Sequence, residues 1–95
     1  MLNSPQLCFH VPFDERTAYE VEMRGYWSHS FVKFDDGSCR DVVFYDPVRL
    51  AQDLEEETTQ GRPFIAEKRL IVLNSVTVEE MQKAVNCLAK EGFFD

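Results

Sequence analysis

The sequence predicts an α+β protein, with an antiparallel meander of about four strands, one further strand, and two helices packed on one face of the sheet. Two observations point to this class. Short apolar segments, several with the two-residue period of strands, fill the first half of the chain. The last third carries instead an apolar stripe at helical spacing behind a helix-capping sequence. The predicted order of elements is therefore ββββαβα.

Two strands are expected near the start of the chain. Within residues 7–11, apolar side chains alternate with Cys8 and His10, and Pro12 ends the ladder because it has no amide hydrogen. Within residues 19–24, apolar side chains alternate with charged ones, which is the pattern of a half-buried strand. The charged face of this second strand is expected to meet water.

A hairpin is predicted to follow the third strand, residues 30–34, with its loop at Gly37. A two-residue turn would place Lys33 directly opposite Arg40, and like charges in that position repel. A three-residue loop with Gly37 in a bulge pairs Lys33 with Cys39 instead. We favour the bulged loop for this reason.

The returning strand, residues 42–45, leads into the first predicted helix. Asp46 is a side-chain cap, and Pro47 suits the first turn because its missing amide hydrogen is not needed there. The helix extends toward Gly61, and three glutamates near its C-terminal end oppose the helix dipole. Its apolar contacts are expected from Val48, Leu50, Ala51 and Leu54.

A strand and a second helix complete the chain. Residues 70–73 are continuously apolar but too few for a helix, which suits a strand covered on both faces. Thr77 stands three residues before Glu80, as in a capping box, and Gly92 can adopt the left-handed conformation that ends a helix. The helix that precedes this strand permits a crossover, so that the strand lies parallel to its neighbour.

The 95 residues are expected to form a single compact domain, residues 1–95, because an apolar content of 44% suffices for one core. Met1 to Gln6 carry no basic cluster, and no apolar segment of signal-peptide length follows them. The longest apolar runs are four residues, far shorter than a membrane span. We therefore expect a soluble, cytoplasmic protein.

The net charge of −7 argues against nucleic acid and anionic membranes as partners, because both are bound through clustered Lys and Arg. Residues 41–67 carry seven acidic residues against two basic ones. Such a patch can steer a basic protein partner onto the chain. The plainer alternative is a solvated helix end that keeps a small protein soluble. The candidate binding residues in this segment are Asp53, Glu55, Glu56 and Glu57.

The sequence contains no recognisable catalytic, metal or cofactor motif. No nucleophile stands at a recognised spacing from a base, and each of the four glycines is isolated, so no phosphate-binding loop is present. Cys8 and His10 alternate onto one strand face, with His29 as a third ligand to consider, but this is not the spacing of a zinc site. Cys39 and His29 are expected on neighbouring strands, where they could form a catalytic pair. The alternative is that the Cys39 thiol only packs beside the histidine. We expect no metal, no cofactor and no enzymatic activity.

Tyr26, Trp27 and His29 form a second candidate binding surface, because an adjacent Tyr and Trp on a strand point to opposite faces. The outward ring either binds a ligand or fills a contact between two copies, and we expect a homodimer. The leading hypothesis is a non-enzymatic protein–protein interaction module that presents the acidic helix end and the aromatic strand to another protein. The alternative is a small-ligand-binding or catalytic domain with a cleft near Trp27, His29 and Cys39.

Overall fold

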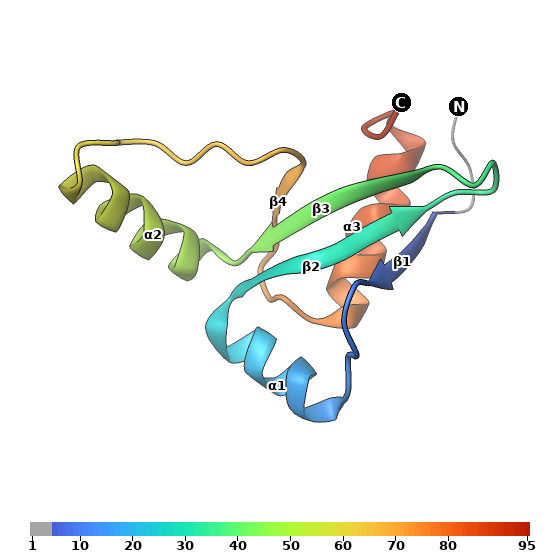
Figure 1. Cartoon of the computed structure of the whole chain (residues 1–95), viewed down its shortest axis with the longest axis horizontal. Helices are drawn as coiled ribbons and strands as arrows, with labels where there is room; N and C mark the ends of the chain where they lie inside the picture. The colour runs from blue at the N-terminus through green and yellow to red at the C-terminus, as the bar shows by residue number, and fades with distance from the viewer. Residues whose placement is uncertain (1–4) are drawn as a thin grey trace.

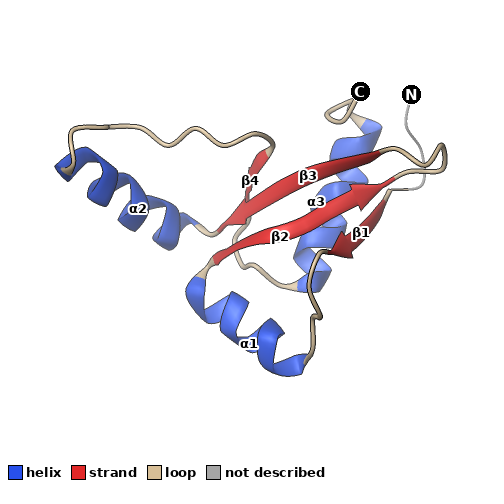
Figure 2. Ribbon diagram, viewed as in Figure 1, coloured by secondary structure: helices blue, strands red, loops and turns tan. Residues whose placement is uncertain are grey.

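The computed structural model describes residues 5–95, in which four strands form one sheet and three helices surround it (Figures 1 and 2). Residues 1–4, part of the segment considered above for a targeting sequence, lie outside the described residues. In chain order the elements are β1 (Gln6–Phe9), α1 (Glu15–Arg24), β2 (Tyr26–Lys33), β3 (Cys39–Tyr45), α2 (Pro47–Thr59), β4 (Leu70–Val72) and α3 (Val78–Lys90).

The fold is α+β, but the predicted order ββββαβα was wrong, because the order across the described residues is βαββαβα. The predicted four-stranded antiparallel meander was wrong as well. The sheet has the strand order β1-β2-β3-β4, in which β3 and β4 are parallel and the other neighbours are antiparallel. The sheet is therefore mixed, and the crossover to a parallel neighbour is confirmed.

The main error concerns residues 19–24, which belong to α1 rather than to a strand. The Asp14 side chain caps this helix by accepting the Thr17 amide at 2.8 Å. Gly25 ends it with a φ of 70° and an amide that donates to the Val21 carbonyl. Val21 is the buried residue of α1. The cap at Asp14 and the stop at Gly25 therefore define a helix of 10 residues, although the apolar residues between them also alternate as in a strand.

The hairpin between β2 and β3 has the bulged loop that the charges favour. Lys33 pairs with Cys39 across the two strands. The Gly37 amide donates to the Phe34 carbonyl at 2.9 Å, and Gly37 has a φ of 86°, which other residues adopt with difficulty. The prediction of a three-residue loop is confirmed.

Helix α3 has the predicted boundaries. The Thr77 hydroxyl accepts the Glu80 amide at 3.2 Å at the first turn. At the other end Gly92 has a φ of 80°, and the Phe93 amide donates to the Leu88 carbonyl at 3.0 Å. This last bond is the mark of a Schellman motif.

The core lies between one face of the sheet and α3, which runs behind the sheet in Figure 1. Phe94, just beyond α3, is 2% exposed, and its ring centroid lies 5.4 Å from that of Phe34. Phe94 is therefore packed into the core, whereas the preceding Phe93 is 41% exposed. The fully buried side chains of the sheet and α3 include Val32, Val42, Phe44, Met81 and Val85.

Helix α2 does not pack on the sheet, so the prediction that both helices share one sheet face was wrong. None of its residues is buried. Figure 1 shows α2 and residues 60–69, together called the α2 arm below, projecting away from the sheet. The cause lies at the first turn of α2, where the Asp46 amide donates to the Gly25 carbonyl at 2.9 Å and Arg49 Nη1 donates to the Arg24 carbonyl at 3.3 Å. These bonds tie the first turn of α2 to the end of α1, and farther along the helix Asp53 accepts the hydroxyl of Tyr45, at the end of β3.

Across residues 5–95, no helix is both long enough and apolar enough to cross a membrane.

Candidate functional site

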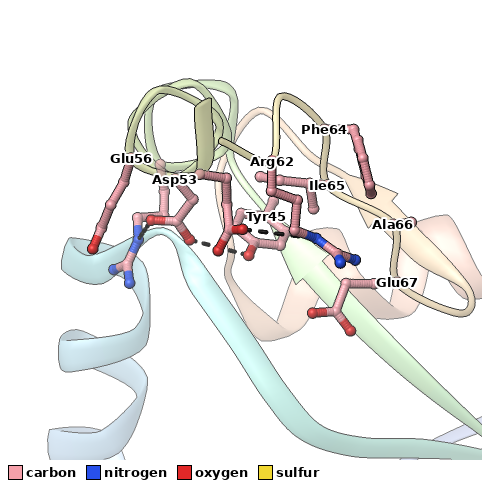
Figure 3. Close-up of a pocket in the computed structure, with 10 residues that line it drawn as sticks. Tyr45, Asp53, Glu56, Arg62, Phe64, Ile65, Ala66 and Glu67 are labelled. Atoms are coloured by element: carbon pink, nitrogen blue, oxygen red, sulfur yellow. Dashed lines mark hydrogen bonds and ion pairs between the residues drawn. The ribbon is translucent and has the colours of Figure 1, made fainter. Parts of the chain in front are cut away.

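A cavity of about 340 Å³ opens on the α2 arm, between α2 and the extended chain that follows it (Figure 3). Four carboxylates and two guanidinium groups line it, which gives the lining a net charge of −2. The lining residues are Tyr45, Arg49, Asp53, Glu56, Glu57, Arg62, Phe64, Ile65, Ala66 and Glu67. A cavity of this sign favours a cationic group over an anionic one.

The inner wall of the cavity is a hydrogen-bonded group of three side chains centred on Asp53. Arg49 Nε donates to Asp53 Oδ1 at 2.8 Å, one helical turn along α2. The Tyr45 hydroxyl, from the end of β3, donates to Asp53 Oδ2 at 3.1 Å. Both carboxylate oxygens of Asp53 are thus occupied, and its charge is balanced by Arg49.

Tyr45 and Arg49 keep their protons at neutral pH. Burial, followed by the hydrogen bond from Tyr45 to Asp53 and the charge of that carboxylate, raises the pKa of Tyr45 well above its ordinary value. The hydrogen bond to Asp53 also raises the pKa of Arg49. A general acid or base needs a pKa near the working pH, so this wall is suited to holding charge in place rather than to moving protons.

The outer rim of the cavity is formed around Arg62. A Schellman motif ends α2, because the Arg62 amide donates to the Glu57 carbonyl at 2.9 Å and Gly61 has a φ of 88°. The Arg62 side chain then turns back, with Nε 3.8 Å from Glu57 Oε2 and its guanidinium carbon 4.5 Å from the centre of the Phe64 ring. An aromatic ring and a carboxylate therefore flank one cation at the mouth of the cavity.

The structure brings together three of the four acidic residues that the sequence singled out. Asp53, Glu56 and Glu57 all line the cavity, whereas Glu55 is exposed on α2 outside the lining. Glu56 and Glu67 approach the cavity from α2 and from the chain leading to β4 (Figure 3). The acidic segment therefore forms part of a cavity wall in addition to a charged helix end.

The aromatic strand surface is divided between the two faces of the sheet, as predicted. Trp27 is 6% exposed and belongs to the core, with its ring 5.3 Å from that of Phe13. Tyr26 packs on the other side against Tyr45, at 4.8 Å between ring centroids, and under the Arg49 guanidinium at 5.6 Å. Tyr26 therefore supports the cavity wall from behind.

Trp27, His29 and Cys39, near which the alternative cleft was predicted, do not line the acidic cavity or a second cavity in the described part of the chain. The second, of about 300 Å³, lies between α1 and the start of α3 and is lined by residues such as Tyr19 and Val78. His29 is exposed and its ring lies 5.2 Å from that of Trp27. Cys39 is exposed beside the hairpin loop, where it pairs with Lys33 rather than with His29.

The cysteines and histidines weighed as metal ligands have other neighbours. His10 Nε2 lies 3.0 Å from Asp41 Oδ1, and the Cys8 thiol donates to the Gln6 carbonyl at 3.6 Å. In the described part of the chain, no group of three or more His, Cys, Asp or Glu side chains is placed to hold a metal ion.

Sequence reasoning missed the basic and aromatic half of the site. The spacing of Arg49 and Asp53 is that of a helical ion pair, so this contact was available from the sequence. Arg62, Phe64 and Glu67 gave no such signal, because they lie in an irregular segment whose course is set by how α2 ends and where β4 begins.

Comparison of the chain with protein-family models, with curated proteins and with solved structures yields no significant match. The function is therefore argued from the residues of the site.

Proposed function

We propose that this protein is a non-enzymatic protein–protein interaction module that binds a basic protein through the acidic cavity of the α2 arm. The observation that carries the proposal is the cavity itself, whose lining has a net charge of −2 and which stands on a helix with no buried residue. A site held away from the body of a small domain is accessible to a partner much larger than a metabolite.

The acidic charge of the cavity is only partly neutralised within the chain. Asp53 is paired with Arg49, and Glu57 is loosely paired with Arg62 at 3.8 Å. Among the described residues, Glu56 and Glu67 have no ion-pair partner. Unpaired carboxylates around a concavity attract cations over several ångströms and raise the rate at which a basic partner arrives.

Arg62 indicates which chemical group the cavity mouth suits. Its guanidinium occupies the space between the Phe64 ring and Glu57, yet its side chain remains 58% exposed. A planar cation above an aromatic ring with a carboxylate at its edge gains both cation–π and ion-pair attraction. We propose that an arginine or lysine side chain of the partner takes this place and displaces the weakly held Arg62.

Acid–base catalysis is a poorer use of the same residues. Burial and the hydrogen bond to Asp53 raise the pKa of Tyr45, and both oxygens of Asp53 are already occupied by Tyr45 and Arg49, so this wall offers no group poised to transfer a proton. The alternative of a ligand or catalytic cleft near Trp27, His29 and Cys39 is less well supported, because none of these three residues lines the acidic cavity.

Comparative affinity capture from the native lysate tests the proposal. Three baits are used: the wild-type chain, a variant with Glu55, Glu56 and Glu57 changed to Gln, and a control with the exposed Glu15, Glu22 and Glu91 changed to Gln. We expect a protein rich in Lys and Arg to stay on the wild-type and control baits at salt concentrations that release it from the α2 variant. Retention of the same proteins at the same salt by all three baits would contradict the proposal.

A further inference from the structure

One side of α2 presents apolar side chains that the rest of the described chain leaves largely exposed. The residues recur at spacings of three and one along the helix and so lie on one side of it. Leu54 is 40% exposed, and Leu50 is only partly buried. This side, called the α2 stripe below, consists of Pro47, Leu50, Ala51 and Leu54.

One face of the sheet is partly uncovered as well, although Tyr45 on this face is buried beside α2. Strand register places Val43 beside Leu70 and Tyr45 beside Val72, on the face opposite the buried Phe44 and Ile71. Val72 is 47% exposed, and in Figure 1 no helix lies over the face toward the viewer. The open sheet face, as we call it, has as its apolar residues Phe31, Val43, Leu70 and Val72.

The α2 stripe and the open sheet face belong to a strand–helix–strand motif, β3–α2–β4, in which the helix ordinarily packs on the sheet. A helix that connects two parallel strands normally lies on the sheet and buries one of its faces. Here α2 connects the parallel strands β3 and β4, yet its first turn is bonded to the Gly25 and Arg24 carbonyls at the end of α1. Apart from Arg49 and Asp53, which contact Tyr26 and Tyr45 at the end of the sheet, the chain therefore holds α2 away from its own sheet.

We propose that a second copy of this chain supplies the missing cover, with the α2 stripe of each copy lying on the open sheet face of the other. A two-fold dimer satisfies both surfaces of both copies at once, because each contact is repeated by symmetry. In this dimer, the contact that a crossover helix usually makes with the sheet of its own chain is made with the sheet of the other chain.

The charges at the two surfaces fit this pairing better than a contact between two α2 helices. Exposed Lys33 and Lys68, with Arg69, lie on or beside the open sheet face and outnumber Asp41, the exposed carboxylate that pairs with Phe31 there. Glu55 is exposed next to the α2 stripe. Helix against sheet brings opposite charges together, while helix against helix would bring the glutamates of two copies together. Asp53 and Glu57 border the α2 stripe, because each stands three residues from one of its leucines, whereas Glu56 lies on the side of α2 away from Leu50 and Leu54.

Light scattering and sedimentation of the purified chain at micromolar concentration test the dimer. We expect a mass twice the monomer value of 11.1 kDa. Leu54→Asp and Val72→Lys should each raise the dimer dissociation constant by about tenfold or more, since each buries a charge in an apolar contact. Val11→Lys is the control, because Val11 is 41% exposed and lies on neither surface. Circular dichroism establishes that each variant is folded.

Mixing the two weakened variants tests the helix-on-sheet arrangement. In a mixed dimer, one intact α2 stripe meets one intact open sheet face, and the introduced Asp meets the introduced Lys. We expect the mixture to dimerise more tightly than either variant alone. A monomeric wild-type chain would overturn the proposal, as would a dimer that withstands Leu54→Asp or Val72→Lys, or a mixture that dimerises no better than its components. A monomeric wild-type chain would leave the comparison of baits in the lysate unchanged, so that experiment judges the acidic site separately.

Discussion

The Asp46 carboxylate lies directly against the α-carbon of Gly25, so that the end of α1 and the cap of α2 form a single joint. The Asp46 amide donates to the Gly25 carbonyl at 2.9 Å, and Asp46 Oδ1 accepts the Arg49 amide at 2.7 Å. A β-carbon on Gly25 would overlap the Asp46 carboxylate, and Gly25 also has a φ of 70°. This joint sets the direction in which the α2 arm leaves the sheet.

Gly25→Ala is expected to destabilise the fold by about 2 kcal/mol or more, because backbone strain at positive φ and a steric overlap act together. Gly37→Ala is the matched control, since Gly37 has a φ of 86° but open space around it. The control should cost only about 1 kcal/mol. Urea denaturation of both variants measures the difference. Equal losses of unfolding free energy would contradict the joint described here.

Gly92→Ala is expected to cost about 1 kcal/mol, because Gly92 ends α3 at a φ of 80° while the added methyl group meets only the movable Asp95 side chain at 3.3 Å. The neighbouring Glu91 has a φ of −89°, so Glu91→Ala should change the unfolding free energy by less than about 0.5 kcal/mol. An unchanged or raised denaturation midpoint for Gly92→Ala would show that α3 does not depend on this stop.

Tyr45 should resist ionisation and make stability fall in alkaline solution. Its pKa is raised in the folded state, so its contribution is fully present below the ordinary tyrosine pKa of about 10. Above that pH the contribution is lost, because the unfolded chain gains by releasing the proton. Absorbance titration should show Tyr45 ionising at a higher pH than the ordinary tyrosine value.

Tyr45→Phe provides the control for this pH dependence. The variant should lose about 1 kcal/mol at neutral pH, since Asp53 loses a donor, and its denaturation midpoint should fall less steeply in alkali. If the denaturation midpoints of the variant and the wild-type chain fell equally with rising pH, the loss of stability in alkali would come from groups other than Tyr45.

The elements predicted correctly are those marked by residues with a strong local requirement. Thr77 marks the start of α3 and Gly92 its end. Gly37 and the charge of Lys33 together determine the type of hairpin loop. Helix α1 has comparable signals, because Asp14 caps its start and Gly25 ends it. It was overlooked because the intervening residues also alternate like a strand, and a period of two is hard to separate from 3.6 over so few positions.

The position of α2 and the shape of the cavity had no local marker. An apolar pattern such as Leu50 and Leu54 shows that a helix has an apolar side, but not what that side faces. The answer here depends on bonds between residues distant in sequence, such as Arg49 with the Arg24 carbonyl. The acidic residues were found because charge is visible in composition, whereas Arg62 and Phe64 acquire their roles only from the path of the loop.

The association rate of the captured partner with the wild-type chain, measured by stopped flow across a salt series, tests the central claim most directly. Changing Glu55, Glu56 and Glu57 to Gln should slow association several-fold at low salt and leave dissociation nearly unchanged, because charges at a rim act mainly on encounter. The rates should converge as salt rises, and the variant with Glu15, Glu22 and Glu91 changed to Gln should follow the wild-type chain more closely. Equal association rates for all three proteins at low salt would contradict the claim that the α2 arm receives a basic partner.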